Sequence, residues 1–209
     1  MAEELRRGVG ELWGKILRHP FVVELYGGVL PLEKFRYYLL QDYFYLVNFA
    51  RALSLAAARA PGVGEMKMAL SLAYGTATGE MANYERFLQE VGLSVEQAVA
   101  TEPNWVNRAY MAFLLSTCAL EDFYACMAAV APCFWTYLDI AEAHRDKLRQ
   151  NRVELYVKWA STYLTSEYRA LVEGVKRALA GAEPRRLLPY FKTAAEYELE
   201  FWEAAYRMQ

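Results

Sequence analysis

Helical periodicity runs through nearly the whole chain, and no stretch alternates apolar and polar residues as a half-buried strand would. The pattern favours amphipathic and buried helices that are separated by glycine and proline. The sequence therefore predicts an all-α protein. We expect helices over residues 3–18, from Pro31 to about 59, 64–91, 94–99, from Pro103 to about 117, 119–131, from Pro132 to about 150, 152–165, 166–180 and 187–207.

The 209 residues show no linker, no low-complexity tract and no internal repeat. A chain of this length can bury a sizeable core as one domain. We expect residues 1–209 to form a single helical bundle of about eight helices. Gly75 and Gly79 lie inside the helix expected over 64–91 and predict a kink or close packing there.

The composition argues against several classes of partner. The formal net charge is −2, and no run of Lys or Arg suggests a nucleic-acid surface. The start of the chain lacks the apolar segment of a signal peptide. The two most apolar stretches, 109–120 and 123–138, are expected to be core helices and not membrane spans, since the first is short and the second contains Pro132. We expect a cytoplasmic protein.

The cysteines and histidines give little support for a metal site. The chain has three cysteines, no C-x-x-C pair and only two histidines, His19 and His144. Cys118 and Cys126 are expected to behave as small buried apolar residues. His19 precedes Pro20 at a helix end, where a capping role is expected. We therefore expect no metal and no cofactor.

Cys133 is the cysteine with a physical reason to be a nucleophile. Proline favours the first turn of a helix, so Pro132 predicts that Cys133 lies at a helix start. A helix N-terminus lowers the pKa of a thiol. Tyr137 lies four residues on and shares the same face. The alternative is a buried cysteine beside a core tyrosine.

Asp42 lies in the middle of a long helix among aromatic and aliphatic residues, and Tyr45 and Phe49 share its face. If that face is buried, the carboxylate needs a partner. A ligand amine or amidine would serve, and so would a tyrosine hydroxyl or Arg51. The sequence leaves these alternatives open.

Glu198 is the acid of the last helix that is expected to point inward, because it shares a face with Phe201 and Trp202. A carboxyl in an apolar pocket has a raised pKa and can act as a general acid or base near neutral pH. Glu196 and Glu200 are better explained as surface acids.

Aromatic residues make up 15% of the chain, with sixteen tyrosines. Tyr110, Tyr137 and Tyr163 lie in otherwise apolar helices. Most aromatic side chains must be core, but a few could line a pocket for a flat ring and present hydroxyl groups to it.

Taken together, four segments resemble the TenA/thiaminase II family in order and spacing. They are FRYYLLQDYFYL at 35–46, PCFWTY at 132–137, Lys158-Trp159 through Tyr163, and YELEFW at 197–202. The resemblance implies a haem-oxygenase-like helical fold and a homotetramer. It also implies hydrolysis of 4-amino-5-aminomethyl-2-methylpyrimidine to the hydroxymethyl compound, or cleavage of thiamine, in thiamine salvage.

The resemblance further implies roles for single residues. Cys133 would be the nucleophile and Glu198 the acid/base, while Asp42 would bind the amino group and nitrogen of the pyrimidine. Tyr45, Tyr110, Tyr137 and Tyr163 would contact the ring or the catalytic groups, and Phe201 would help line the pocket. One departure is visible: many members carry E-x-x-x-H, whereas here Glu80 is followed by Tyr84.

Two other functions remain open from the sequence. The chain could bind a pyrimidine without turning it over. It could also be a haem or di-iron oxidase of the same fold, which would require His19 or His144 as a ligand.

Overall fold

The computed structural model describes residues 1–209 and is built from helices alone, as the periodicity predicts. The first half contains α1 (Ala2–Gly8), α2 (Gly10–Leu17), α3 (Pro20–Gly27), α4 (Leu32–Ala58), α5 (Val63–Gly75), the π-helix η1 (Thr76–Glu80), α6 (Met81–Glu90) and α7 (Val95–Ala100). The second half contains α8 (Trp105–Leu120), α9 (Phe123–Ala143), α10 (Arg145–Gln150), α11 (Glu154–Ser161), the 3₁₀ turn η2 (Thr162–Leu164), α12 (Ser166–Ala178), the 3₁₀ turn η3 (Leu179–Gly181) and α13 (Pro184–Arg207).

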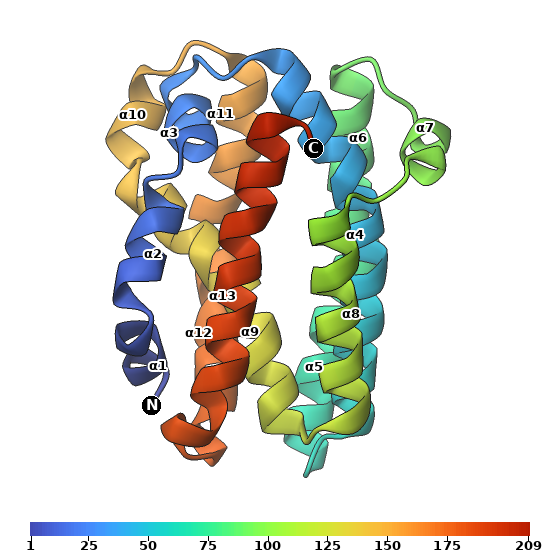
Figure 1. The fold of residues 1–209 in the computed structure, drawn as a ribbon, viewed down its shortest axis with the longest axis vertical. Helices are drawn as coiled ribbons and strands as arrows, with labels where there is room; N and C mark the ends of the chain where they lie inside the picture. The colour runs from blue at the N-terminus through green and yellow to red at the C-terminus, as the bar shows by residue number, and fades with distance from the viewer.

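The long helices run along the length of an elongated bundle (Figure 1). The closest packing is between α13 and α9, between α4 and its neighbours α5 and α8, and between α12 and α9. One hydrophobic cluster extends through the bundle, with Trp13, Trp135 and Trp202 among its largest fully buried side chains. The expected single all-helical bundle is confirmed.

Helix α9 differs from the sequence prediction. The break expected at Pro132 falls instead at Glu121–Asp122, and α9 continues through Pro132 to Ala143. The Asp122 carboxylate caps the helix by accepting the N–H of Ala125 at 3.0 Å. Packing of α9 against helices on several sides compensates for the one backbone hydrogen bond that a proline removes.

Three further boundaries were predicted wrongly. The helix expected over 3–18 is divided at Val9, and the one expected to reach 150 is divided at His144. Helix α3 was not expected, although its sequence signals are present. Pro20 occupies its first turn, and His19 Nδ1 accepts the N–H of Phe21 at 3.2 Å. His19 therefore does cap a helix, but at the start of α3.

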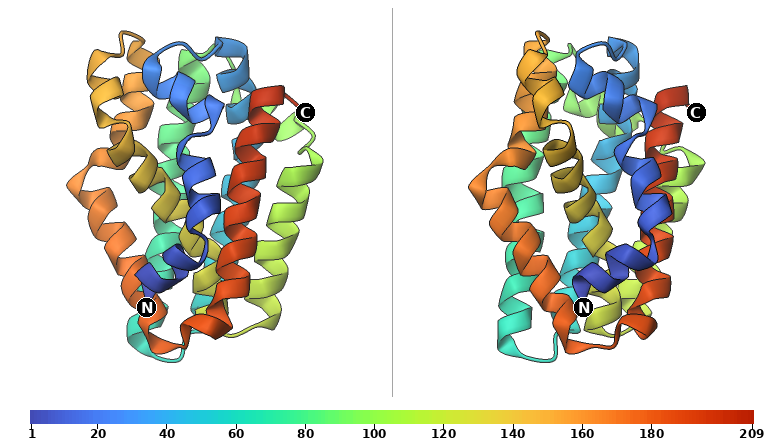
Figure 2. Two further views of the ribbon diagram at one scale, coloured as in Figure 1. Left: turned by 60° about the vertical axis from the view of Figure 1, so that its left-hand side comes forward. Right: turned by 90° about the vertical axis from the view of Figure 1, so that its left-hand side faces the viewer.

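Helix α9 is also long and apolar enough to cross a membrane by length and composition, with a window of mean hydropathy 1.3. However, 78% of that window is buried inside the protein. Its position between α13, α12, α8 and α4 is that of a core helix, as expected from the sequence. Two further views show α9 enclosed by the other long helices (Figure 2).

Candidate active site

Residues from five elements meet in an inner cavity between α4, η1, α9, η2 and α12. Asp42 and Tyr45 come from α4, and Cys133 and Tyr137 come from α9. The other lining residues are Tyr38, Leu46, Glu80, Phe134, Tyr163 and Tyr168. Five residues predicted from the sequence, Asp42, Tyr45, Cys133, Tyr137 and Tyr163, therefore line one cavity.

Cys133 is partly buried in the middle of α9, so the prediction that it lies at a helix start is wrong. Burial raises the pKa of its thiol well above the usual value, and the charges of Glu198, Glu80 and Asp42 raise it further. The nearby Tyr45 hydroxyl lowers the thiol pKa, by more than either Glu80 or Asp42 raises it. Cys118 and Cys126 are fully buried away from this cavity, as expected.

Asp42 is partly buried and makes no hydrogen bond or ion pair with another side chain. Arg51, one of the partners considered from the sequence, donates instead to Asn48 Oδ1 at 3.0 Å. Burial raises the pKa of Asp42 well above its usual value, and the nearby Glu80 and Glu198 add to this effect. Its carboxyl group is thus directed to the cavity and free to bind a ligand.

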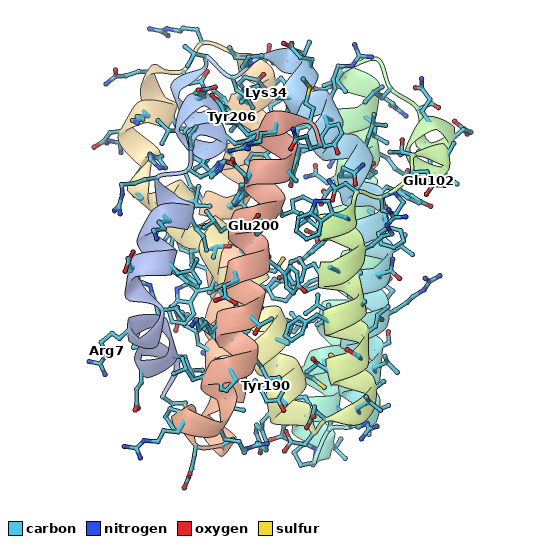
Figure 3. The ribbon with its side chains drawn as sticks, viewed as in Figure 1. Arg7, Lys34, Glu102, Tyr190, Glu200 and Tyr206 are labelled. Carbon is cyan, nitrogen blue, oxygen red and sulfur yellow. The ribbon has the colours of Figure 1, made fainter.

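Glu198 is buried on the inward face of α13, as predicted, at 4% exposure. Its carboxylate accepts a hydrogen bond of 2.7 Å from the Tyr110 hydroxyl and one of 3.5 Å from Thr136 Oγ1. Burial raises the pKa of Glu198 to about 7, although both hydrogen bonds oppose the rise. Glu196 and Glu200 are exposed, and Glu200 lies on the outward face of α13 (Figure 3).

The tyrosines divide into two groups. Tyr38 and Tyr137 share a hydrogen bond of 3.0 Å between their hydroxyls, and Tyr110 is committed to Glu198. In contrast, the Tyr45 hydroxyl is buried without a hydrogen-bond partner. A buried polar group of this kind needs an explanation, and a ligand in the cavity would provide one.

Phe201 does not line the cavity itself. Its ring packs against Tyr45 at 5.6 Å and against Tyr38 at 6.1 Å between centroids. The predicted lining role is therefore indirect in this structure, because Phe201 supports the tyrosines that do face the cavity.

Glu80 was not predicted as a site residue, apart from its place in E-x-x-x-H. It is the last residue of η1, and it lines both the inner cavity with Cys133 and a second one with Asp42 and Tyr84. It is accessible to solvent, yet the surrounding protein raises its pKa to about 7, opposed by a hydrogen bond with Thr76. Besides that motif position, the sequence signal was the glycine pair of this turn, with Gly75 just before η1 and Gly79 inside it.

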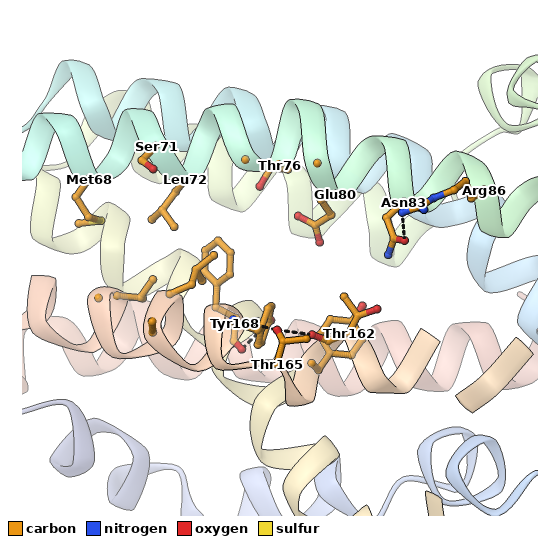
Figure 4. Close-up of a pocket in the computed structure, with 18 residues that line it drawn as sticks. Met68, Ser71, Leu72, Thr76, Glu80, Asn83, Arg86, Thr162, Thr165 and Tyr168 are labelled. Atoms are coloured by element: carbon orange, nitrogen blue, oxygen red, sulfur yellow. Dashed lines mark hydrogen bonds between the residues drawn. The ribbon is translucent and has the colours of Figure 1, made fainter. Parts of the chain in front are cut away.

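A larger cavity of about 730 Å³ opens between α5–η1–α6 and η2–α12 (Figure 4). Glu80, Phe134, Tyr163 and Tyr168 line both this outer cavity and the inner one. Its volume is typical of small-molecule pockets. The two inner cavities hold only about 20 Å³ each, room for about one water molecule. A ring that enters from the outer cavity must therefore displace side chains such as Tyr163.

Comparison with known proteins identifies the family. The model of the TENA/THI-4/PQQC family matches residues 6–208, which is nearly the whole chain. This chain belongs to the TENA/THI-4/PQQC family. Among curated TenA relatives, the aminopyrimidine aminohydrolase of Bacillus subtilis is 31% identical, over 100% of this chain and 90% of its own length. That of Helicobacter pylori is 26% identical, over 99% of both chains.

Solved TenA structures agree closely with this fold. A TenA homologue from P. horikoshii OT3 superimposes with a TM-score of 0.96 at 42% identity, covering 99% of this chain and 98% of that one. A domain from Shewanella denitrificans, described as having a heme oxygenase-like fold, gives a TM-score of 0.81 at 13% identity, covering 100% of this chain and 93% of that one. The haem-oxygenase-like fold implied by the resemblance is confirmed.

In this TenA-family chain, Tyr84 occupies the position where the resemblance led us to expect histidine. Its ring is buried, and its hydroxyl donates to the Leu39 carbonyl at 2.8 Å. It lines the second inner cavity beside Asp42. The tyrosine therefore fixes α6 to α4 and contributes an aromatic surface, with its hydroxyl already bonded.

The histidines needed for an oxidase lie elsewhere. Both ring nitrogens of His19 are engaged, with Phe21 and with Glu203 at 2.9 Å. His144 Nε2 lies 2.7 Å from the Leu17 carbonyl. Neither histidine lines the inner cavities, and no three His, Cys, Asp or Glu side chains are grouped as a metal site.

Proposed function

We propose that this chain hydrolyses thiamine-related aminopyrimidines. The reaction would convert 4-amino-5-aminomethyl-2-methylpyrimidine to the hydroxymethylpyrimidine, cleave thiamine, or do both, as part of thiamine salvage. The main support is that Asp42, Cys133 and the unpartnered Tyr45 hydroxyl line one cavity. Relatives that match along the full chain carry the name aminopyrimidine aminohydrolase.

The cavity residues suggest how the reaction proceeds, together with Glu198, which is buried on α13 and does not itself line the cavity. Asp42 binds the amino group and adjacent nitrogen of the ring, for which it has no competing partner in the protein. Glu198 takes the proton of the Cys133 thiol as the sulfur adds to an electrophilic ring carbon, and it passes that proton to a ring nitrogen. A pKa near 7 leaves Glu198 able to donate and to accept a proton at neutral pH. The leaving group then departs from the methylene carbon on the ring, water adds to that carbon, and the bond between the ring and Cys133 breaks to release the product and the thiol.

The tyrosines complete this proposal. Tyr45, Tyr137 and Tyr163 would contact the ring from the cavity wall, and Tyr110 would hold Glu198 in place through its hydrogen bond. Phe201 would support the ring of Tyr45. No cofactor or metal is assigned to this chemistry, which needs only the thiol, the carboxyls and water.

The direct test is Cys133→Ser, assayed by chromatography of the product from each substrate. We expect kcat/KM to fall by at least about 100-fold, since a serine hydroxyl is a much weaker nucleophile. Cys126→Ser is the matched control, because this cysteine is on the same helix but outside the cavity. Wild-type kcat/KM in Cys133→Ser would contradict the proposed role of Cys133 as nucleophile. Ligand binding by the wild type without any product would identify a binding protein.

We also propose that the chain forms a homotetramer in the cytoplasm. In support, apolar side chains are exposed along one helix, with Val63 at 65%, Leu70 at 50% and Tyr74 at 72% exposure on α5. Contiguous exposed apolar surface is typical of an interface. All three cysteines are free, as is usual in a reducing compartment. Light scattering of the purified protein would give a mass four times the 24.0 kDa of the chain.

A further inference from the structure

The outer cavity is more than an entrance, because its lining has two distinct parts (Figure 4). At its junction with the inner cavities, Glu80 points from η1 into the space between the two helical walls, opposite Thr162, Thr165 and Tyr168. Away from this junction the wall is apolar, formed by Met68, Leu72, Leu171 and Val175. Glu80 is common to all three adjoining cavities.

Small residues keep the outer cavity open. Gly75, Gly79 and Gly174 line it, and a Cβ added at Gly75 or Gly79 would meet no atom within 4 Å. These positions lie on the α5–η1 wall, so the missing side chains leave room directly beside Glu80. The space therefore extends from the carboxyl group into the apolar part.

The ionisable side chains of this region are acidic, apart from one arginine at its edge. The inner cavities are lined by Asp42 and Glu80 and by no lysine, arginine or histidine. Arg86 is the single cationic side chain on the outer cavity, and its guanidinium donates to Asn83 Oδ1 at 2.9 Å. It lies farther along the wall than Glu80 and Asn83 (Figure 4). No cation of the protein thus neutralises the Glu80 carboxylate.

We propose that the outer cavity is the leaving-group subsite of this enzyme, with Glu80 as the counter-ion for a positively charged nitrogen on the exocyclic methylene carbon. This inference rests on the proposed function. With the ring on Asp42 and Cys133, a substituent that points outward passes Glu80 before it reaches the apolar wall. The subsite therefore selects cationic amines and heterocycles that carry an apolar body.

The proposed subsite fits the bond changes of the reaction. The bond between the methylene carbon and the cationic nitrogen breaks, and its electron pair stays on nitrogen, which becomes neutral. Water forms the new carbon–oxygen bond, and the proton that it gives up passes to the Glu80 carboxylate, which no longer faces a cation. The net products are the hydroxymethylpyrimidine, the neutral amine or heterocycle, and one proton.

The first experiment uses Glu80→Gln, which keeps the size of the side chain and removes its charge. We expect KM for the aminomethyl substrate and for thiamine to rise by about 10- to 100-fold, the usual effect of losing a charge-assisted contact. Binding of the neutral hydroxymethylpyrimidine, measured by calorimetry, should stay within about twofold. Unchanged KM values, or equal weakening of the neutral product, would overturn the proposal.

The second experiment fills the subsite with Gly79→Leu. We expect it to raise KM for thiamine at least about tenfold more than KM for the small aminomethyl substrate, because only the heterocycle needs the full space. Gly64→Leu is the matched control, since its added Cβ also meets nothing and Gly64 does not line the cavity. Equal effects of Gly79→Leu on both substrates would contradict the subsite. Melting temperatures establish that each variant is folded.

Ligand binding by the Cys133→Ser variant tests this inference independently of the proposed function. If the wild type produced no hydroxymethylpyrimidine, the proposed function would fail. Calorimetry with thiamine and with the neutral product would still test the subsite, comparing Cys133→Ser with the double variant that also carries Glu80→Gln. Selective loss of thiamine binding in the double variant supports the subsite, and equal binding by both proteins refutes it.

Discussion

The Tyr45 hydroxyl is buried without a partner in the cavity that contains Cys133. An unsatisfied buried hydroxyl destabilises a protein by roughly 1–3 kcal/mol. Tyr45→Phe should therefore leave the melting temperature unchanged or raise it, while kcat/KM falls by about tenfold through loss of a ligand contact. Tyr26→Phe is the control, because its hydroxyl is also buried and unpartnered but lies outside the cavity. Equal activity of both variants would mean that Tyr45 does not contact the ligand.

Glu198 makes the stability of the fold depend on pH. Its pKa rises from 4.5 in the unfolded chain to about 7 in the folded protein, so the folded state binds more protons between these values. The contribution of Glu198 to the free energy of unfolding is largest below pH 4.5. This contribution, on the order of 3 kcal/mol, is lost as the pH rises through 7.

Denaturant titrations between pH 4.5 and 8.5 test this effect. We expect the free energy of unfolding of Glu198→Gln to fall less with rising pH than that of the wild type. His19 and His144 have lowered pKa values, so their contributions increase with pH. Both proteins share them, and they cancel in the comparison. Parallel curves for the two proteins would show that the Glu198 pKa is not raised.

The site residues differ in how well the sequence predicted them. Helical spacing placed Glu198 on the inner face of its helix, and the structure agrees. Cys133 lines the cavity, but its predicted position at a helix start was wrong. It lies in the middle of α9, where burial raises the pKa of its thiol. Glu80 was missed because its direction depends on a π-turn, which regular helical spacing does not anticipate.

Among the elements, α9 carries its proline in its interior, which costs about 3 kcal/mol relative to alanine. Pro132→Ala would restore a backbone hydrogen bond to the Ala128 carbonyl. We expect a higher melting temperature together with a lower kcat, because Cys133 follows directly and would shift with the backbone. Thermal unfolding and steady-state kinetics measure both effects. A lower melting temperature would show that the surrounding packing requires the proline geometry.

The π-helix η1 holds Glu80 over the cavity through its wider turn. Deleting the exposed Ala77 should convert η1 into α-helix and turn Glu80 away, while α5 and α6 keep their packing. The deletion should retain the helical circular dichroism signal and raise KM for cationic substrates as Glu80→Gln does. Wild-type KM values in a folded deletion variant would mean that the π-turn does not position Glu80.

Helix boundaries were less predictable than helix existence, and capping explains why. Asp122 begins α9 with a carboxylate that also pairs with Arg186 at 2.7 Å, a contact across 64 positions of sequence. His19 begins α3 while its other ring nitrogen contacts Glu203 on α13. These caps depend partly on tertiary contacts, which a local pattern does not contain.

At the scale of the whole molecule, periodicity and proline placement were sufficient to predict a single all-helical bundle. They could not predict the cavities, because α4, η1, α9, η2 and α12 are brought together only by packing. The site therefore joins segments between residues 38 and 168. A ligand bound there contacts several long helices at once, so its binding is coupled to the stability of the complete fold.

This coupling predicts a thermal shift. At a hydroxymethylpyrimidine concentration of 100 times Kd, binding adds about 2.7 kcal/mol to the free energy of unfolding. For a chain of this size, that corresponds to a rise in melting temperature of roughly 5–10 °C. Cys133→Ser should keep the shift, because the neutral product needs no thiolate, whereas Asp42→Asn should lose most of it. A shift that survives Asp42→Asn would place the ligand outside the inner cavity, since Asp42 is the carboxyl there without a partner in the protein.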